Sequence, residues 1–296
     1  MSLTMQEKEQ LMQVLNRTGG QREVNLRQRV IPEEYASLIH QVEREELTLA
    51  LTEVPVRCVI TKDPKRAEGC PVHVNLHGGG FVHPQDADDD RYCARVALGI
   101  RGIVVDVDYA VCPDYVFPVA FDQCYAVVKW AFSQCAAWNA DPGKVSLGGH
   151  SAGGDLTAAI SIKAAQTGDF KLCMQVLDYA ANDNYMPLIT EGQERSAAFS
   201  MLYADGDPEK LKNPLVSPVY ATPEQLKNQP RTVIVEAGIC PFRDVNRRYA
   251  QMLIEAGTEV WFLPYPGSLH GFTVRLTGDW DSAQKAIIRA LNTCGK

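Results

Sequence analysis

A strand, a glycine-rich turn and a helix follow one another in residues 145–165, and this pattern restricts the fold more than any other feature. Val145–Leu147 is a short apolar run typical of a buried strand, and Gly153–Ala165 has the spacing of a helix. The turn between them contains Gly-His-Ser-Ala-Gly at residues 149–153. Its glycines permit a sharp turn and close packing, so Ser151 is predicted to lie at the tip.

The same alternation of apolar runs and helical segments continues along most of the 296 residues. One helix, for example, is predicted at Phe121–Ala136. Such alternation is typical of an α/β fold, in which a mostly parallel sheet carries helices on both faces. The predicted strands are Leu47–Thr52, Val54–Thr61, Val72–Leu76, Gly102–Val107, Val145–Leu147, Lys171–Leu177, Thr232–Glu236 and Glu259–Leu263.

Two regions depart from this alternation. Amphipathic segments at Gln6–Asn16 and Pro32–Arg44 have helical spacing, so residues 1–46 are predicted to form helices ahead of a core at residues 47–296. Residues 182–230 are rich in Pro, Asn, Asp and Gly, with one short helix predicted at Glu194–Leu202. A long excursion from an α/β sheet usually covers the functional site as a lid or cap.

The composition excludes several classes of partner. The formal net charge is −7 and the pI is about 5.4, and an acidic chain repels phosphate backbones, so nucleic acid is not expected. No unbroken apolar stretch has the length of a secretory signal or a membrane span. The nine cysteines lack CxxC spacing. We therefore expect reduced thiols in the cytoplasm, with Cys124 and Cys173 as small core residues.

A run of glycines follows the predicted strand Val72–Leu76. Glycines in His77–Gly80 let the backbone approach a substrate oxygen and direct N–H groups at it. Together with the N–H of Ala152, these donors are predicted to form an oxyanion hole. A phosphate-binding loop is the competing interpretation, but neither GxxxxGK[ST] nor GxGxxG is present.

His270 lies in a loop predicted after the last strand, within Pro-Tyr-Pro-Gly-Ser-Leu-His-Gly-Phe (264–272). A single histidine is more often a satisfied surface or core residue. Here it is the third element after the glycine run and Ser151, and that order favours a general base acting on the serine.

These motifs resemble the hormone-sensitive-lipase-like family of α/β-hydrolases, which includes many bacterial carboxylesterases. The resemblance covers roughly residues 47–290. It rests on HGGGF (77–81), DYAVCPDYVFPVAFDQCYAVVKW (108–130), DPGKVSLGGHSAGGDL (141–156) and YPGSLHGF (265–272).

The resemblance implies an eight-stranded core with a helical cap built from the N-terminal helices and residues 182–230. It implies Ser151 as nucleophile and His270 as base. It also implies Gly79, Gly80 and Ala152 as oxyanion donors, with neither metal nor cofactor. Family members are often dimers, so a homodimer is expected by analogy.

One position departs from the family pattern. The family has Asp-Pro/Ser-Leu-Arg-Asp where this chain has Cys-Pro-Phe-Arg-Asp at residues 240–244, so Cys240 replaces the acid that orients the histidine. A neutral thiol neither holds the tautomer as a carboxylate does nor stabilises the imidazolium. Loss of the acid can cost about 10⁴-fold in kcat.

Several groups could take the place of that acid. Asp244 is preferred, because it lies one helical turn beyond Cys240, and Asp183 comes second, as an acid after the neighbouring strand. Glu236 lies inside its strand and is expected to point below the site. A Cys240 thiolate paired with an imidazolium is a further alternative. In the last alternative Cys240 only packs, and Ser151 and His270 act as a dyad.

Two other segments have structural interpretations. The acidic residues 85–92 lack a calcium-loop spacing and are predicted to begin a helix, where acids favour the dipole. Residues 108–114 are expected to support the glycine run without taking part in chemistry.

The function predicted from these residues is hydrolysis of carboxylic esters of small, largely apolar molecules. Thioester, lactone or amide hydrolysis would use the same groups. The alternative is a catalytically impaired protein that binds ligands on a hydrolase fold, because Cys240 occupies the position of the acid. The presence of Ser151 and His270 argues against that alternative.

Overall fold

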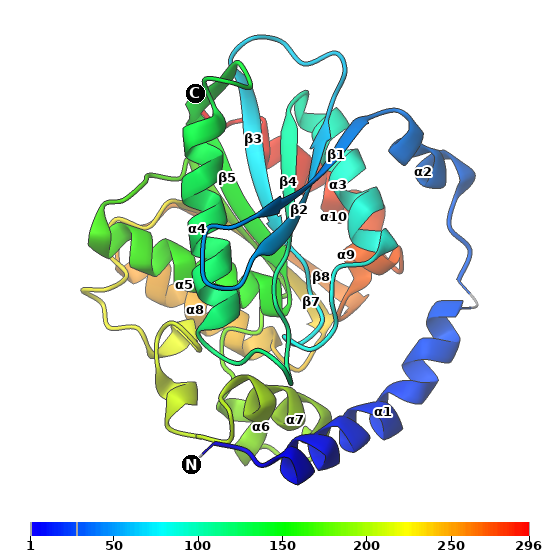
Figure 1. Ribbon diagram of the computed structural model, residues 1–296, viewed down its shortest axis with the longest axis vertical. Helices are drawn as coiled ribbons and strands as arrows, with labels where there is room; N and C mark the ends of the chain where they lie inside the picture. Colours follow the sequence, from blue (N-terminus) through cyan, green and yellow to red (C-terminus); the bar gives the residue numbers. More distant parts are fainter. Residues whose placement is uncertain (1, 28, 296) are drawn as a thin grey trace.

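Eight strands form a single sheet at the centre of the molecule (Figure 1). The computed structural model describes residues 2–27 and 29–295, with the backbone alone over 20–27. The strand order is β1-β2-β4-β3-β5-β6-β7-β8. β2 runs antiparallel to β1 and β4, and every other neighbouring pair is parallel, which confirms the predicted sheet. The strands are β1 (Glu43–Leu49), β2 (Val56–Lys62), β3 (Cys70–Leu76), β4 (Ile103–Asp108), β5 (Ala140–His150), β6 (Met174–Asp178), β7 (Arg231–Ile239) and β8 (Val260–Leu269).

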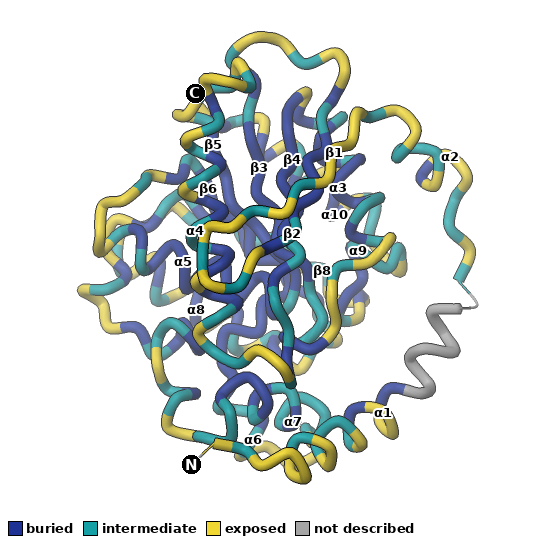
Figure 2. Tube along the Cα trace, in the orientation of Figure 1, coloured by how far each residue is buried: buried dark blue, intermediate teal, exposed yellow. Residues whose placement is uncertain are grey.

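Helices cover both faces of this sheet and bury its central strands, which are dark blue in Figure 2, whereas β1 is mostly exposed. On one face lie α4 (Val119–Gln134), α5 (Ala152–Thr167) and α8 (Arg243–Glu255). On the other lie α3 (Ala87–Ile100) and α10 (Trp280–Leu291). Each helix contributes fully buried apolar side chains, such as Val127 from α4 and Ile287 from α10. Central strands buried on both faces need apolar runs rather than alternation, as the sequence has.

The N-terminal segment is only partly as predicted. The first helix is longer than expected, since α1 spans Met5–Arg27. The predicted helix Pro32–Arg44 is wrong beyond residue 40, because α2 (Glu33–Ala36) and the 3₁₀ turn η1 (Ser37–His40) are followed by β1. Strand pairing outweighs helical spacing there. β1 pairs along its whole length with β2, and cross-strand ion pairs such as Lys62–Glu45 (3.2 Å) support the register.

The long excursion carries only short elements. Its helices are α6 (Met186–Ile189) and α7 (Glu194–Tyr203), the second of which confirms the helix predicted at Glu194–Leu202. Two 3₁₀ turns follow, η2 (Lys210–Lys212) and η3 (Pro218–Tyr220). Figure 1 places α6 and α7 beside the first half of α1, at one end of the molecule. Across residues 2–27 and 29–295, no helix has the length and apolar character that crossing a bilayer requires.

Two of the cysteines, which were expected to be reduced, form a disulfide. Cys173 and Cys294, 121 residues apart, form a disulfide that joins the start of β6 to the residues after α10. The prediction of Cys173 as a reduced core residue is therefore wrong, because its partner lies too far along the chain for local sequence to reveal. Cys124 is fully buried and unpaired, as predicted.

Close backbone packing at the start of α5 depends on glycine. A Cβ built on Gly153 would overlap the carbonyl oxygens of Leu76 and His77, and one on Gly149 would overlap the Gly153 backbone. Backbone atoms cannot move aside as a flexible side chain can. The turn that carries Ser151 thus requires small residues on both sides.

We expect Gly153→Ala to destabilise the protein by about 3 kcal/mol, because the added methyl group forces α5 away from β3. Gly168→Ala is the matched control. Gly168 has φ 71° but open space around it, so only backbone strain of about 1 kcal/mol is expected. Urea unfolding monitored by circular dichroism measures both. Equal losses in the two variants would contradict the packing argument.

Candidate active site

Ser151 lies at the turn between β5 and α5. Its backbone has φ 55° and ψ −113°, values that are rare for a residue with a side chain. Hydrogen bonds hold the turn on both sides. The Ser151 N–H donates to the carbonyl oxygen of Asp178 (3.0 Å), and the Ala181 N–H donates to that of Ser151 (3.0 Å). The predicted position of Ser151 at the tip of a strand–turn–helix is confirmed.

His270 follows β8 and faces Ser151. Its Nε2 lies 2.9 Å from the Ser151 Oγ, although the two residues are 119 positions apart. The ring packs against Tyr179 in an edge arrangement, with centroids 5.0 Å apart, and against Phe242 at 5.7 Å. These contacts orient the imidazole toward the serine hydroxyl.

Cys240 lies on the opposite side of that imidazole. Its Sγ is 3.1 Å from Nδ1 of His270, and the Phe242 N–H donates to the same sulfur at 3.4 Å. Burial raises the pKa of the Cys240 thiol to about 12, and the charges of Glu236 and Asp178 act in the same direction. The thiol therefore keeps its proton at neutral pH, which disfavours the thiolate–imidazolium alternative.

The glycine run is held in a conformation that only glycine adopts readily. Gly79 has φ 118° and Gly80 has φ 64°. A Cβ on Gly79 would lie 2.7 Å from the His83 carbonyl oxygen, and one on Gly80 would lie 2.6 Å from the Phe199 ring. Ala152 is the first residue of α5, so its N–H has no acceptor within the helix.

Residues 108–114 support this loop, as predicted. The Tyr109 hydroxyl donates to the carbonyl oxygen of His77 (2.8 Å), and the two rings stack with centroids 4.0 Å apart. The Cys112 N–H donates to the carbonyl oxygen of Phe81 (2.7 Å). Contacts on both sides of the glycines therefore fix the loop.

One cavity of about 660 Å³ connects these groups. Ser151, His270, Gly79, Gly80 and Ala152 all contribute to its walls. Apolar side chains from α7, from the turn between β7 and α8, and from α9 make up much of the remainder, and charged side chains lie at other points. Among these are Phe199, Phe242, Val274, Asp86, Arg195 and Arg275.

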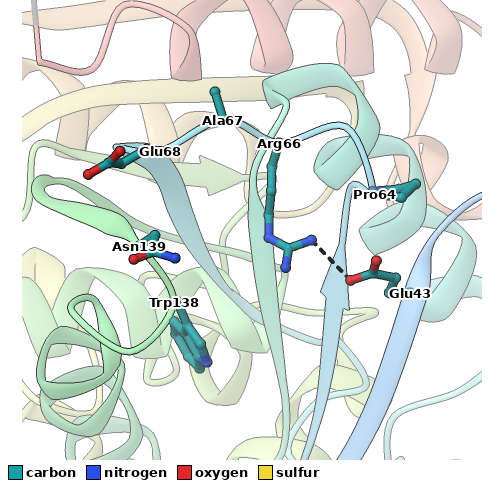
Figure 3. Close-up of a pocket in the computed structure, with 7 residues that line it drawn as sticks. All are labelled: Glu43, Pro64, Arg66, Ala67, Glu68, Trp138 and Asn139. Atoms are coloured by element: carbon teal, nitrogen blue, oxygen red, sulfur yellow. Dashed lines mark hydrogen bonds and ion pairs between the residues drawn. The ribbon is translucent and has the colours of Figure 1, made fainter.

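A second cavity, of about 340 Å³, lies at the opposite edge of the sheet (Figure 3). It is beside the amino ends of β3 and β5, and an ion pair between Arg66 and Glu43 (3.0 Å) crosses it. Its walls hold no serine, cysteine or histidine. We therefore assign the chemistry to the larger cavity.

The acidic segment at residues 85–92 begins α3, as predicted. Asp86 is the N-cap, its carboxylate accepts from the Asp88 N–H (2.7 Å), and Asp89 accepts from the Asp86 N–H (3.0 Å). Within residues 2–27 and 29–295, no group of three or more His, Cys, Asp or Glu side chains is arranged to hold a metal ion.

Known proteins share both the sequence and the structure of this chain. A family model described as the alpha/beta hydrolase fold matches residues 73–274. Esterase LipI of Mycobacterium tuberculosis is 32% identical over 237 residues, which cover 77% of this chain and 73% of LipI. Carboxylesterase NlhH of the same bacterium is 30% identical over 261 residues, which cover 83% of this chain and 80% of NlhH. A hyperthermophilic esterase from the archaeon Pyrobaculum calidifontis is 26% identical, with a TM-score of 0.81 over 99% of each chain.

The chain belongs to the hormone-sensitive-lipase-like family of α/β-hydrolases. The family and the α/β-hydrolase fold with its eight-stranded, mostly parallel sheet, both predicted from the motifs, are confirmed. The matched region runs from β3 to α9 (Phe272–Arg275) and contains the glycine run, Ser151, Cys240 and His270.

The acid position of this hydrolase requires a correction. Asp244 was the preferred substitute, but its side chain is 77% exposed and forms an ion pair with Arg243 (2.8 Å). Asp183 accepts hydrogen bonds from the N–H groups of Tyr185 (3.0 Å) and Met186 (2.9 Å). The atom beside Nδ1 of His270 is the Cys240 sulfur. α8 begins at Arg243 and presents Asp244 to solvent, so the contacts do not support Asp244 as the orienting acid.

A buried network beside the hydrolase site was missed by sequence reasoning. Asp178 ends β6, and its Oδ2 accepts from the Thr273 hydroxyl (2.5 Å) and lies 2.9 Å from Nδ1 of His150. Thr273 also bonds to the hydroxyl of Tyr179 (2.8 Å), the residue that packs on His270. The available signal was an acid directly after the predicted strand Lys171–Leu177, next to the strand that leads to Cys240.

We expect Asp244→Asn to leave kcat/KM for an aryl ester within about twofold of the parent value, since an exposed ion pair contributes little. The measurement is steady-state hydrolysis at neutral pH. Glu255→Gln, which removes another exposed acid of α8, is the matched control. A loss of tenfold or more confined to Asp244→Asn would restore Asp244 as the orienting acid.

Proposed function

We propose that this hydrolase cleaves carboxylic esters of small, largely apolar molecules through an acyl-enzyme on Ser151. The observation that carries the proposal is the 2.9 Å approach of Ser151 Oγ to Nε2 of His270 at the wall of the large cavity. The esterase names of its relatives support the reaction class.

Proton transfer to His270 activates the serine. For Nε2 to accept the Ser151 proton, the neutral ring must carry its own proton on Nδ1, which then donates to the Cys240 sulfur. Ser151 Oγ attacks the ester carbonyl carbon as its proton moves to Nε2. The bond formed is Oγ–C, and the carbonyl π electrons pass to the oxygen.

The oxyanion produced by this attack needs donors already in place. The N–H groups of Gly79, Gly80 and Ala152 are proposed to supply them, because all three residues line the cavity beside Ser151. Their positions are set by the packing of the loop and by the start of α5. No reorganisation is then required when the charge develops.

Collapse of the intermediate releases the alcohol. The imidazolium of His270 returns its proton to the leaving oxygen as the C–O bond breaks, and the acyl group stays on Ser151. Water repeats the sequence, with His270 as base, and releases the acid. Neither half-reaction needs a group outside this chain and the two substrates.

Cys240 is proposed to position the His270 ring without stabilising its charge. A protonated thiol accepts the Nδ1–H bond but brings no negative charge to the imidazolium. The negative charges of Asp178 and Glu236 raise the pKa of the Cys240 thiol. A nearby negative charge likewise raises the pKa of an imidazolium, because it stabilises the protonated ring. Both acids already have partners, since Glu236 pairs with Arg247 (2.5 Å) and Asp178 Oδ2 accepts from the Thr273 hydroxyl (2.5 Å) and lies 2.9 Å from Nδ1 of His150. Neither therefore replaces a carboxylate at position 240 in full.

We also propose that residues 1–46 and the 182–230 excursion form a cap over the core at residues 47–296. α7 contributes Arg195, Ser196, Phe199 and Ser200 to the cavity wall. α1 joins α7 through a hydrogen bond from Nη1 of Arg195 to the Leu15 carbonyl oxygen (2.5 Å). The cap would therefore shape the substrate pocket. Part of the 1–46 segment lies outside the described residues.

A pure ligand-binding role is not favoured. That alternative was suggested by the Cys240 thiol in place of the orienting acid. The hydrogen bond between Ser151 and His270, however, has the length that nucleophile activation requires. The relatives that match over most of the chain are named as esterases.

Ser151→Ala should reduce hydrolysis of 4-nitrophenyl butyrate by at least about 10²-fold, because the nucleophile is lost. A fluorophosphonate probe should label the parent protein at Ser151, as read by mass spectrometry, and should leave Ser151→Ala unlabelled. Ser133→Ala, which changes a serine on the outside of α4, is the matched control. Ester turnover that persists in Ser151→Ala would refute the acyl-enzyme.

Cys240→Asp should raise kcat by at least about tenfold, with a ceiling near 10⁴-fold, because a carboxylate stabilises the imidazolium. Cys240→Asn is the matched control, since the asparagine side chain has nearly the same size as aspartate and an acceptor oxygen but no charge. It should give no such gain. If Cys240→Asp and Cys240→Asn change kcat equally, the charge at this position does not limit the rate.

A further inference from the structure

Arg275 is a charged residue in the cavity that the proposed chemistry does not use. It ends α9, which begins two residues after His270, and its side chain lines the cavity. The side chain runs back over Gly271. A Cβ built on Gly271 would lie 3.0 Å from Nε of Arg275 and 3.1 Å from its Cδ. The start of the guanidinium group is thus placed beside the residue that follows His270.

No carboxylate of the described residues lies within the 4.0 Å that defines an ion pair with Arg275. The carboxylates that act on it from farther away are Asp86 and Asp88. Asp86 caps α3 by accepting from the Asp88 N–H, and Asp88 pairs with both Arg29 and Arg91. The nearby acids are therefore engaged elsewhere.

A partly buried guanidinium without a counter-ion is costly. Burial lowers the pKa of Arg275, which is the mark of a cation that is removed from water and incompletely compensated. If the residue only covered Gly271, an aliphatic side chain would do so without that cost. The planar fork of an arginine matches a carboxylate, which can accept two parallel hydrogen bonds from it.

We propose that Arg275 is an anion-binding subsite and that the preferred substrates are esters with an apolar body and one carboxylate group. The inference rests on the proposed function, because it names the substrate class of the same site. The apolar walls from Phe199, Phe242 and Val274 contact the hydrocarbon part, and the guanidinium binds the carboxylate. The carboxylate can belong to the acyl part or to the alcohol part of the ester.

Two pairs of substrates distinguish a carboxylate on the acyl part of the ester from one on the alcohol part. For the acyl part, 4-nitrophenyl hemiglutarate is compared with 4-nitrophenyl valerate, which has the same chain length and no charge. For the alcohol part, the butyrate ester of 4-hydroxybenzoic acid is compared with that of 4-hydroxybenzamide. The readout is the ratio of kcat/KM for the anionic ester to that for its neutral partner, in which general effects of a substitution cancel.

In the parent protein we expect this ratio to be at least 1 in one of the two pairs. Arg275→Gln should lower it about 10- to 100-fold in that pair, the range expected for a lost hydrogen bond to a charged group. Arg275→Lys keeps the charge without the fork and should give an intermediate ratio. Arg289→Gln, which removes an exposed cation of α10, is the control for net charge and should keep the parent ratio.

Two results would overturn the subsite. One is a parent ratio below about 0.1 in both pairs, a result that does not depend on any variant. The other is a ratio that Arg275→Gln leaves unchanged in both pairs. Failure of the proposed function looks different, because neutral esters would then not be hydrolysed, or would be hydrolysed equally well by Ser151→Ala.

Discussion

The contact between the first turn of α5 and the end of β3 determines where the groups of the site lie. Gly153 approaches the carbonyl oxygens of Leu76 and His77 so closely that no Cβ fits between them. β3 and β5 are paired in register from Val72 with Val145 to Leu76 with Gly149. Because β3 leads directly into the glycine run, one backbone contact places Ser151 and the glycine run against each other.

The parallel order β5-β6-β7-β8 places the remaining groups. The carboxyl ends of these strands lead, in turn, to Ser151, Asp178, Cys240 and His270. Neighbouring strands are separated by about 5 Å, so these strand ends gather polar groups at one edge of the sheet. β8 lies three strands from β5, and the turn after β8 carries the His270 ring back to Ser151 Oγ. The serine–histidine–cysteine chain follows from this arrangement, although its members are far apart in sequence.

Local patterns predicted more of the molecule than long-range pairings did. The turn at Ser151, the glycine run and the start of α3 each depend on a few consecutive residues, and sequence alone placed them. Asp178 was missed although it directly follows the predicted strand, because its contacts with His150 and Thr273 are long-range and no local pattern reveals them. The bond between Cys173 and Cys294 could not be predicted, because it depends on where α10 packs against the sheet.

On the proposed mechanism, the thiol of Cys240 changes which part of the site determines the rate. A missing carboxylate corresponds to about 5 kcal/mol of transition-state stabilisation, an amount that a neutral sulfur does not replace. On the proposed mechanism, the oxyanion donors then supply a larger share of the remaining catalysis. The glycine run that carries two of these donors is packed between Tyr109, which stacks on His77, and Phe199, which lies against Gly80.

Such packing matters because a donor helps only if it is already in position when the charge develops. The Tyr109 ring and its hydroxyl hold His77 at the start of the loop, and Phe199 of α7 lies against Gly80. The loop is therefore confined between the core and the 182–230 excursion. On the proposed mechanism, the excursion would act on catalysis as well as on the shape of the pocket, because displacement of Phe199 would release the backbone that is proposed to bind the oxyanion.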